Sequence, residues 1–185
     1  IKEVESVVVY NGVETIGPNA YQGMTSLINV KMFDTVKSIG SFAFGGCQSL
    51  KEIVLPEAIE TLSANAFNGC TALEKVIFSN EESAGVEIGG TCFSNCKNLQ
   101  EVYFSHVKKI VKEAFKGCSK ITRVVILNQE SLPTLEENAF YSVPTTATFY
   151  VSSNLLNVWK DALAGYGITD VKVYTSNDSN DENID

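Results

Sequence analysis

The chain is built from an internal repeat, whose clearest copies are FAFGGCQSL at residues 42–50 and NAFNGCTAL at residues 65–73. A small residue precedes an aromatic ring in each unit, and Gly or Asn stands two residues after the first five rings. The rings recur at intervals of 23, 23, 26, 22 and 25 residues, at Tyr21, Phe44, Phe67, Phe93, Phe115 and Phe140. A period of about 20–50 residues is typical of solenoids, in which stacked units bury a core that one unit cannot bury alone.

Each unit contains a short run of alternating apolar residues, such as LKEIVLP at 50–56 and LEKVIFS at 73–79. This alternation, rich in β-branched residues, predicts strands that stack into a parallel sheet along one side of a right-handed coil. The Gly-containing second half of each unit predicts a second short extended piece and a tight, partly helical turn. The predicted inward residues are Val7 and Val9, Val30 and Met32, Ile53 and Leu55, Val76 and Phe78, Val102 and Phe104, and Val124 and Ile126.

The stretch from Leu50 to Leu73 reads L-x-x-I-x-L-P-x-x-I-x-x-L-x-x-x-A-F-x-G-C-x-x-L, which resembles the BspA-like leucine-rich repeat. The resemblance covers roughly residues 4–140, and the fourth unit departs from it with Cys92 and Asn95 in place of Ala and Gly. It implies a right-handed leucine-rich-repeat superhelix of short parallel β-strands and tight or 3₁₀ turns. It also implies a bacterial or parasite protein that is extracellular or displayed on the cell surface and takes part in adhesion.

Three segments are expected along the chain: about six leucine-rich repeats in residues 1–150, a C-terminal cap in 151–175 and an acidic tail in 176–185. In the cap, Ser153 is the expected helix N-cap and Gly165 the expected stop, and a last strand is expected near residues 171–174. The cap helix would close the open end of the array. Its predicted apolar positions are Leu155, Val158, Trp159, Ala162, Leu163 and Tyr166.

Charge and hydropathy exclude some partners. The net charge is −8 and no Lys/Arg cluster interrupts it, so neither nucleic acid nor an anionic membrane surface is an expected partner. No apolar run approaches the length of a membrane span, and no basic-then-apolar leader is present, so any export signal or anchor is expected outside this sequence.

The residues that could carry chemistry favour structural roles. Cys47, Cys70, Cys96 and Cys118 occupy one position in consecutive units and are expected to be buried free thiols, with a disulfide or a metal site as the alternative. His106, the only histidine, is expected in a solvent-facing loop. The adjacent carboxylates Glu81–Glu82 and Glu136–Glu137 are expected to be solubilising, since acid/base catalysis needs carboxylates that converge across a cleft. We therefore expect no catalytic residue, cofactor or metal.

A binding surface is predicted on the outer side of the sheet. Between the inward pairs lie outward residues that are mostly apolar, and contiguous exposed apolar surface often marks a partner site. The alternative is that β-branched residues simply suit strands whichever way they point. The predicted partner-binding face consists of Tyr10, Phe33, Val54, Lys75, Ile77, Glu101, Tyr103, Arg123 and Val125.

Three functions remain at this stage. The first is a non-enzymatic module that binds a protein partner, from a host or a neighbouring cell, through this face. The second is an architectural spacer with no ligand of its own. The third is an enzyme with an unfamiliar site, for which a deep pocket with several perturbed titratable groups would be needed.

Overall fold

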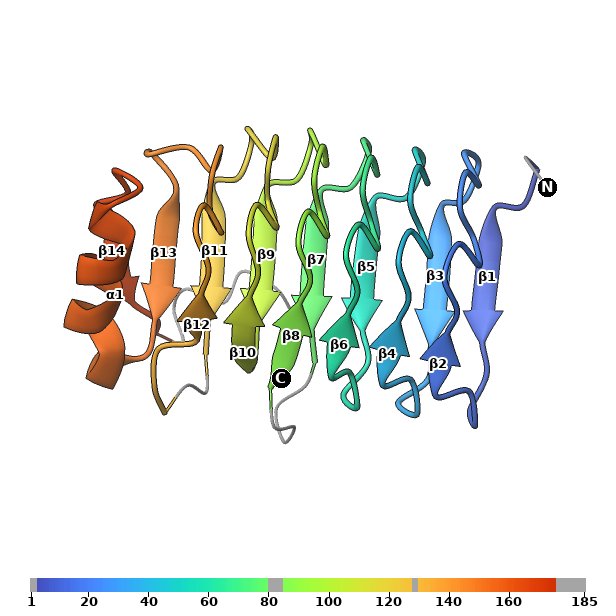
Figure 1. Cartoon of the computed structure of the whole chain (residues 1–185), viewed down its shortest axis with the longest axis horizontal. Coiled ribbons are helices and arrows are strands. Elements are labelled where there is room, and N and C mark those ends of the chain that lie inside the picture. The colour runs from blue at the N-terminus through green and yellow to red at the C-terminus, as the bar shows by residue number, and fades with distance from the viewer. Residues whose placement is uncertain (1–2, 80–84, 128–129, 176–185) are drawn as a thin grey trace.

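The computed structural model describes residues 3–79, 85–127 and 130–175, and these form a parallel β-solenoid of about seven turns with one short α-helix at the C-terminal end (Figure 1). The predicted fold class is confirmed. The strands stand side by side in chain order, and α1 (Leu156–Ala164) covers one end of the row (Figure 1).

The first sheet contains the strands predicted from the alternating runs. β1 pairs with β3, and a six-stranded sheet follows in the order β5, β7, β9, β11, β13, β14, all parallel. Equivalent residues of successive units are register partners, as in Val76↔Val102 and Val124↔Phe149. Its strands are β1 (Ser6–Val9), β3 (Asn29–Met32), β5 (Glu52–Leu55), β7 (Lys75–Phe78), β9 (Glu101–Phe104), β11 (Arg123–Ile126), β13 (Thr148–Val151) and β14 (Val171–Val173).

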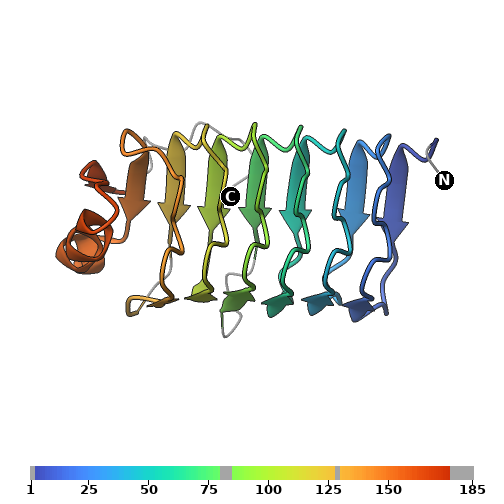
Figure 2. The same cartoon turned by 45° about the horizontal axis from the view of Figure 1, so that its top comes forward.

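A second parallel sheet runs along the other side of the coil, where the sequence predicted only isolated extended pieces (Figure 2). These pieces pair with one another because each turn places them in the same register, as in Ile16↔Ile39 and Ile39↔Leu62. Its six strands are β2 (Thr15–Ile16), β4 (Ser38–Ile39), β6 (Thr61–Leu62), β8 (Val86–Ile88), β10 (Val107–Ile110) and β12 (Thr134–Leu135).

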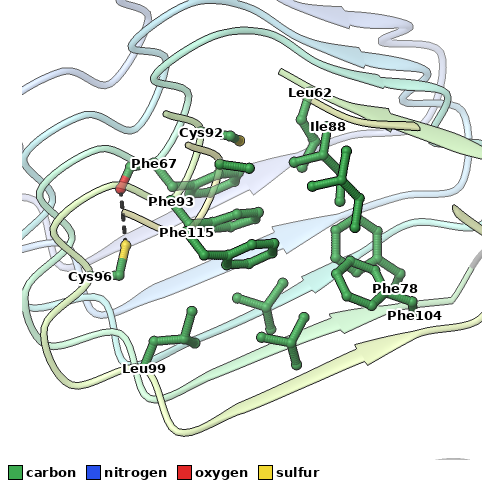
Figure 3. Packing of buried hydrophobic residues seen from close by; sticks show 14 of the residues in the cluster. Leu62, Phe67, Phe78, Ile88, Cys92, Phe93, Cys96, Leu99, Phe104 and Phe115 are labelled. Atoms are coloured by element: carbon green, nitrogen blue, oxygen red, sulfur yellow. Dashed lines mark hydrogen bonds between the residues drawn. The ribbon is translucent and has the colours of Figure 1, made fainter. Parts of the chain in front are cut away.

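The recurring aromatic residues form a column inside the coil (Figure 3). Ring centroids from Tyr21 to Phe140 are 5.1, 5.2, 5.3, 5.5 and 5.9 Å apart, and the planes of consecutive rings lie within 18° of each other. The predicted inward residues from β5 to β11 are buried, whereas Val7, Val30 and Met32 near the N-terminal end are partly exposed. The repeat is therefore a packing unit, as predicted.

The turn before each ring requires a left-handed residue. The position preceding the small residue has φ between 54° and 61° in all six units, and Phe42, Thr91 and Glu113 occupy it in three of them. The Gly or Asn two residues after the ring is also left-handed, with φ of 74° at Gly69 and 61° at Asn95. This conformation explains the Gly-or-Asn pattern of the repeat, because these two residues adopt positive φ most readily.

The C-terminal cap differs in detail from the prediction. Ser153 lies inside a 3₁₀ turn, η1 (Ser153–Leu155), and neither helix N-terminus has a side-chain cap hydrogen bond, so the predicted N-cap role of Ser153 is wrong. Gly165 ends α1 as predicted. Trp159 and Leu163 are buried, one helical turn apart, whereas Val158 is exposed because it lies to the side of that stripe.

Candidate functional site

The interior of the coil is filled by rings and thiols. The thiol of Cys96 donates a hydrogen bond to the carbonyl oxygen of Phe67 in the preceding turn at 3.3 Å (Figure 3). Equivalent bonds join Cys70 to Phe44 at 3.2 Å and Cys118 to Phe93 at 3.1 Å. All five cysteines are free and buried, so the prediction of structural thiols is confirmed.

Burial makes three of these thiols, Cys47, Cys92 and Cys96, poor nucleophiles. It raises the pKa of Cys47 to about 12, and it also raises the pKa of Cys92 and of Cys96 well above the ordinary thiol value. The thiolate is the reactive form, so these cysteines are inert at neutral pH.

The outer face of the first sheet presents three parallel rows of side chains, set by the strand register. The central row runs through Val8, Lys31, Val54, Ile77, Tyr103, Val125, Tyr150 and Lys172. One flanking row is polar or charged, as predicted: Ser6, Asn29, Glu52, Lys75, Glu101, Arg123, Thr148 and Asp170. The other flank carries Tyr10 and Phe33 near the N-terminal end and Leu127 and Tyr174 near the C-terminal end.

The N-terminal half of this face is exposed and apolar. Val8 and Val54 are each 44% exposed, Tyr10 is 69% exposed and Phe33 is 36% exposed. The rings of Tyr10 and Phe33 stack with centroids 6.2 Å apart, and the ammonium of Lys31 lies 5.3 Å from the Phe33 centroid. We call these five residues the N-terminal strip: Val8, Tyr10, Lys31, Phe33 and Val54.

In the C-terminal half of the face the central side chains are buried, so the expected exposure of Ile77, Tyr103 and Val125 is wrong. Ile77, Tyr103 and Val125 are only 8%, 6% and 0% exposed. They pack in a cluster of their own on the outer side of the sheet, separate from the core inside the coil. We call this group the tyrosine cluster: Ile77, Tyr103, Val125, Leu127, Tyr150 and Tyr174.

Cations cover the rings of the tyrosine cluster. The guanidinium of Arg123 lies 4.2 Å from the Tyr150 centroid and 5.9 Å from that of Tyr103, and the Lys75 ammonium lies 5.0 Å from the Tyr103 centroid. The Tyr103 hydroxyl donates to Glu101 Oε2 at 3.0 Å. Lys75, Glu101 and Arg123, which the sequence placed on the binding face, therefore surround a packed aromatic group.

Two members of this cluster were missed from the sequence. Tyr150 lies on β13 and Tyr174 directly follows β14, and these two strands extend the first sheet beyond the sixth repeat unit. The alternating runs TFYV at 148–151 and VKVY at 171–174 carry the signal, since their outward residues continue the rows of the repeats.

Other titratable residues lie in small ion pairs at the surface. A hydrogen bond with Lys109 lowers the pKa of Glu136, which also accepts the backbone N–H of Lys112. Hydrogen bonds from Thr148 and Lys172 lower the pKa of Asp170. His106 lies half-buried in the loop between β9 and β10, and Glu81–Glu82 lie outside the described residues.

Two further properties concern metal ions and membranes. Within the described ranges, no group of three His, Cys, Asp or Glu side chains is placed to hold a metal ion. Across the same part of the chain, no helix combines the length and apolarity that a membrane crossing needs.

Comparison with known proteins identifies the repeat. The model of the BspA type leucine-rich repeat region matches six copies, over residues 2–85 and 82–184. The structure is similar to a leucine-rich repeat protein of T. pallidum, with 23% identity and a TM-score of 0.63 over 88% of this chain and 83% of that chain. It is also similar to the pneumococcal vaccine antigen PcpA, with 19% identity and a TM-score of 0.72 over 93% of this chain and 42% of that chain. At these identities the likeness concerns the fold, and no curated protein sequence matched.

Proposed function

The chain belongs to the BspA type leucine-rich repeat family, and from this we propose that it is a non-enzymatic module that binds a protein partner through the N-terminal strip. The family and its structural neighbours indicate a protein-interaction module in general terms. The partner in this proposal presents an apolar patch bordered by mixed charge, because that surface complements the strip and its polar flank.

The exposure of the N-terminal strip is the observation that supports this proposal. Four apolar side chains from three neighbouring strands lie on one face, and each is at least 36% exposed. Stacked aromatic rings beside a cation form the kind of rigid anchor that dominates binding energy at protein interfaces.

A surface location and a role in adhesion form the finer part of the proposal. Proteins with this repeat are usually secreted or displayed on the surface. PcpA, which has a similar fold, is described as a pneumococcal vaccine antigen, and this supports the finer part of the proposal. We infer that the present chain contacts a protein of a host or of a neighbouring cell.

Replacing both aromatic anchors tests the site. We expect Tyr10→Ser with Phe33→Ser to weaken binding at least tenfold, because an interface hot spot contributes about 2 kcal/mol or more. Surface plasmon resonance against extracellular matrix proteins and purified surface proteins of neighbouring bacteria measures this effect. Thermal unfolding should change little, because exposed side chains contribute about 0.5 kcal/mol or less.

Tyr141→Ser is the matched control, since Tyr141 is also an exposed ring, at 54%, but lies outside the first sheet. It should leave binding unchanged. Equal binding by the double variant and the wild type would contradict the site. Absence of any wild-type binding across the panel would favour the architectural spacer instead.

A further inference from the structure

One exposed aromatic ring occupies a backbone position that disfavours it. Phe42 precedes the small residue of the second unit with φ of 55°, in the left-handed region, and its side chain is 36% exposed. In the described part of the chain it is the only aromatic residue among those with positive φ, and the turns on either side carry Asn19 and Asn65 there. A bulky residue with positive φ is an outlier, and such strain is typical of functional positions.

The ring of Phe42 rests against its own turn. In the third unit the residues equivalent to Phe42 and Gly45 are Asn65 and Asn68, whose side chains bond each other at 2.8 Å. In the second unit the glycine takes the place of that partner side chain. A Cβ atom at Gly45 would lie 3.0 Å from Phe42 Cδ1, and Gly45 is buried. The missing side chain therefore lets the ring lie close to the turn while part of its surface stays open to solvent.

Uncharged amides flank the ring on both neighbouring turns. Backbone hydrogen bonds hold the three turns in register, and their core rings have centroids 5.1 and 5.2 Å apart. Asn65 Oδ1 accepts the bond from Asn68 Nδ2, so Asn65 Nδ2 and Asn68 Oδ1 offer a ligand one donor and one acceptor. The register places two amide side chains on each side of Phe42: Asn19 and Gln22 on the first turn, and Asn65 and Asn68 on the third.

We propose that Phe42 and these amides bind a sugar ring of a neutral carbohydrate. A pyranose whose hydroxyl groups are all equatorial has a flat face of C–H bonds that packs on an aromatic ring. Its hydroxyl groups point outward in the plane of the sugar, toward the flanking turns, and each of them donates and accepts hydrogen bonds. Amides match both functions without a net charge, so a neutral sugar fits better than an anionic one.

An apolar side chain of a protein is the competing occupant of this site. It would cover the Phe42 ring equally well, but it would remove water from the flanking amides without bonding them, and that costs free energy. Carbohydrate is therefore the favoured ligand. The site goes beyond the proposed function, because it lies on the turns that follow β2, β4 and β6, whereas the N-terminal strip lies on the first sheet.

Saturation-transfer nuclear magnetic resonance with cellopentaose and chitopentaose at millimolar concentration tests the site. We expect transfer to the C–H protons of both oligosaccharides and none to sorbitol, which has similar hydroxyl groups but no ring face. Phe42→Asn should abolish the transfer. The midpoint of thermal unfolding should change by about 4 °C or less, because relief of the left-handed strain offsets the lost contact with Gly45.

Gly45→Ala is a second variant that keeps the ring and moves it. The added Cβ would displace Phe42, so transfer should weaken although the ring is still present. The double variant Tyr10→Ser with Phe33→Ser is the control, because it removes exposed rings of the first sheet and should leave transfer unchanged.

Four results would overturn the proposal. These are no transfer to either oligosaccharide in the wild type, equal transfer in Phe42→Asn, a response to sorbitol as strong as that to the sugars, and loss of transfer in the control. A fall in the unfolding midpoint of Phe42→Asn as large as that of the core variant Phe44→Ala would also overturn it, since Phe42 would then be a packing residue. None of these outcomes tests the protein partner of the N-terminal strip, so the proposed function stands or fails separately.

Discussion

At the scale of single residues, the close approach of successive turns is most demanding at the glycines that follow the second-sheet strands. A Cβ atom at Gly89 would lie 2.6 Å from the amide nitrogen of Ala64 and 2.7 Å from the carbonyl oxygen of Leu62. Gly40 meets the preceding turn equally closely, 2.6 Å from the Pro18 nitrogen. Since both neighbours are backbone atoms, the turns themselves would have to move apart.

We therefore expect Gly89→Ala to lower the free energy of unfolding by about 1–3 kcal/mol, as overpacking of a tight site does. Gly165→Ala is the control, because a Cβ there meets nothing within 4 Å and φ is −63°. Urea unfolding measures both variants. Equal stability of the two variants would show that the turns are not in close contact at Gly89.

The left-handed position before each ring gives a second residue-scale prediction. Glu113 has φ of 58°, a conformation that costs an ordinary L-residue about 1–2 kcal/mol and that Asn adopts more readily. Glu113→Asn should raise the free energy of unfolding by about 1 kcal/mol, because it relieves this strain and loses only a partly exposed ion pair with Lys116. Glu113→Gln, which loses the ion pair and keeps the strain, should not stabilise, and a gain equal to that of Asn would refute the backbone explanation.

The sequence contains the signal for this strained position, although the repeat pattern did not use it. Asn19, Asn65 and Asn138 occupy it in three of the six units, and Asn is the residue most tolerant of positive φ after Gly.

The inward positions were predicted correctly because burial selects them with a strict period of two. The burial of Ile77 and Tyr103 was not predictable from that period. The period separates the two faces of a strand and carries no information on how the outer face is packed.

At the scale of elements, the thiol column links each turn to the one before it and makes stability depend on pH. Burial raises the pKa of Cys47 from 9.0 to about 12, so the folded state holds this proton over a range in which the unfolded chain releases it. The stabilisation is complete below pH 9 and is lost as the pH rises toward the folded pKa. Burial also raises the pKa of Cys92 and of Cys96, so these two thiols likewise stabilise the fold less as the pH rises.

The free energy of unfolding should therefore fall steeply as the pH rises above about 9. Each such thiol lowers the free energy of unfolding by about 1.4 kcal/mol per pH unit above its unfolded pKa. Urea unfolding at pH values between about 8 and 11 measures how the free energy of unfolding depends on pH. Cys47→Ala should make that slope smaller by about 1.4 kcal/mol per pH unit, which corresponds to one proton. An unchanged slope in that variant would mean that Cys47 ionises while the protein is folded.

The strands and the cap differ in how far the sequence could place them. Six strands of the first sheet follow from alternation alone, but the second sheet has strands of only two residues in four of its six cases, too short to show a period. Those strands exist because the solenoid aligns them. The side of α1 that is buried also depends on how the helix packs on the end of the coil, so helical spacing alone could not show that Val158 is exposed.

At the scale of the whole molecule, the coil leaves no interior room for a ligand in the described part of its repeats. Stacked rings from Tyr21 to Phe140 fill one side of the cross-section and the inward strand residues fill the other. Function is therefore assigned to the outer surface. There the N-terminal strip is open and the tyrosine cluster is packed, so the N-terminal strip is the proposed binding surface.

Labelling of the five cysteines with N-ethylmaleimide, followed by mass spectrometry, tests most directly whether the coil is closed around its interior. All five thiols are buried in the structure, so under native conditions we expect labelling to be as slow as global unfolding and to rise in parallel at all five with urea. Rapid native labelling of Cys70, Cys96 and Cys118, at the rate of the unfolded chain, would contradict a closed core and the assignment of function to the outer surface.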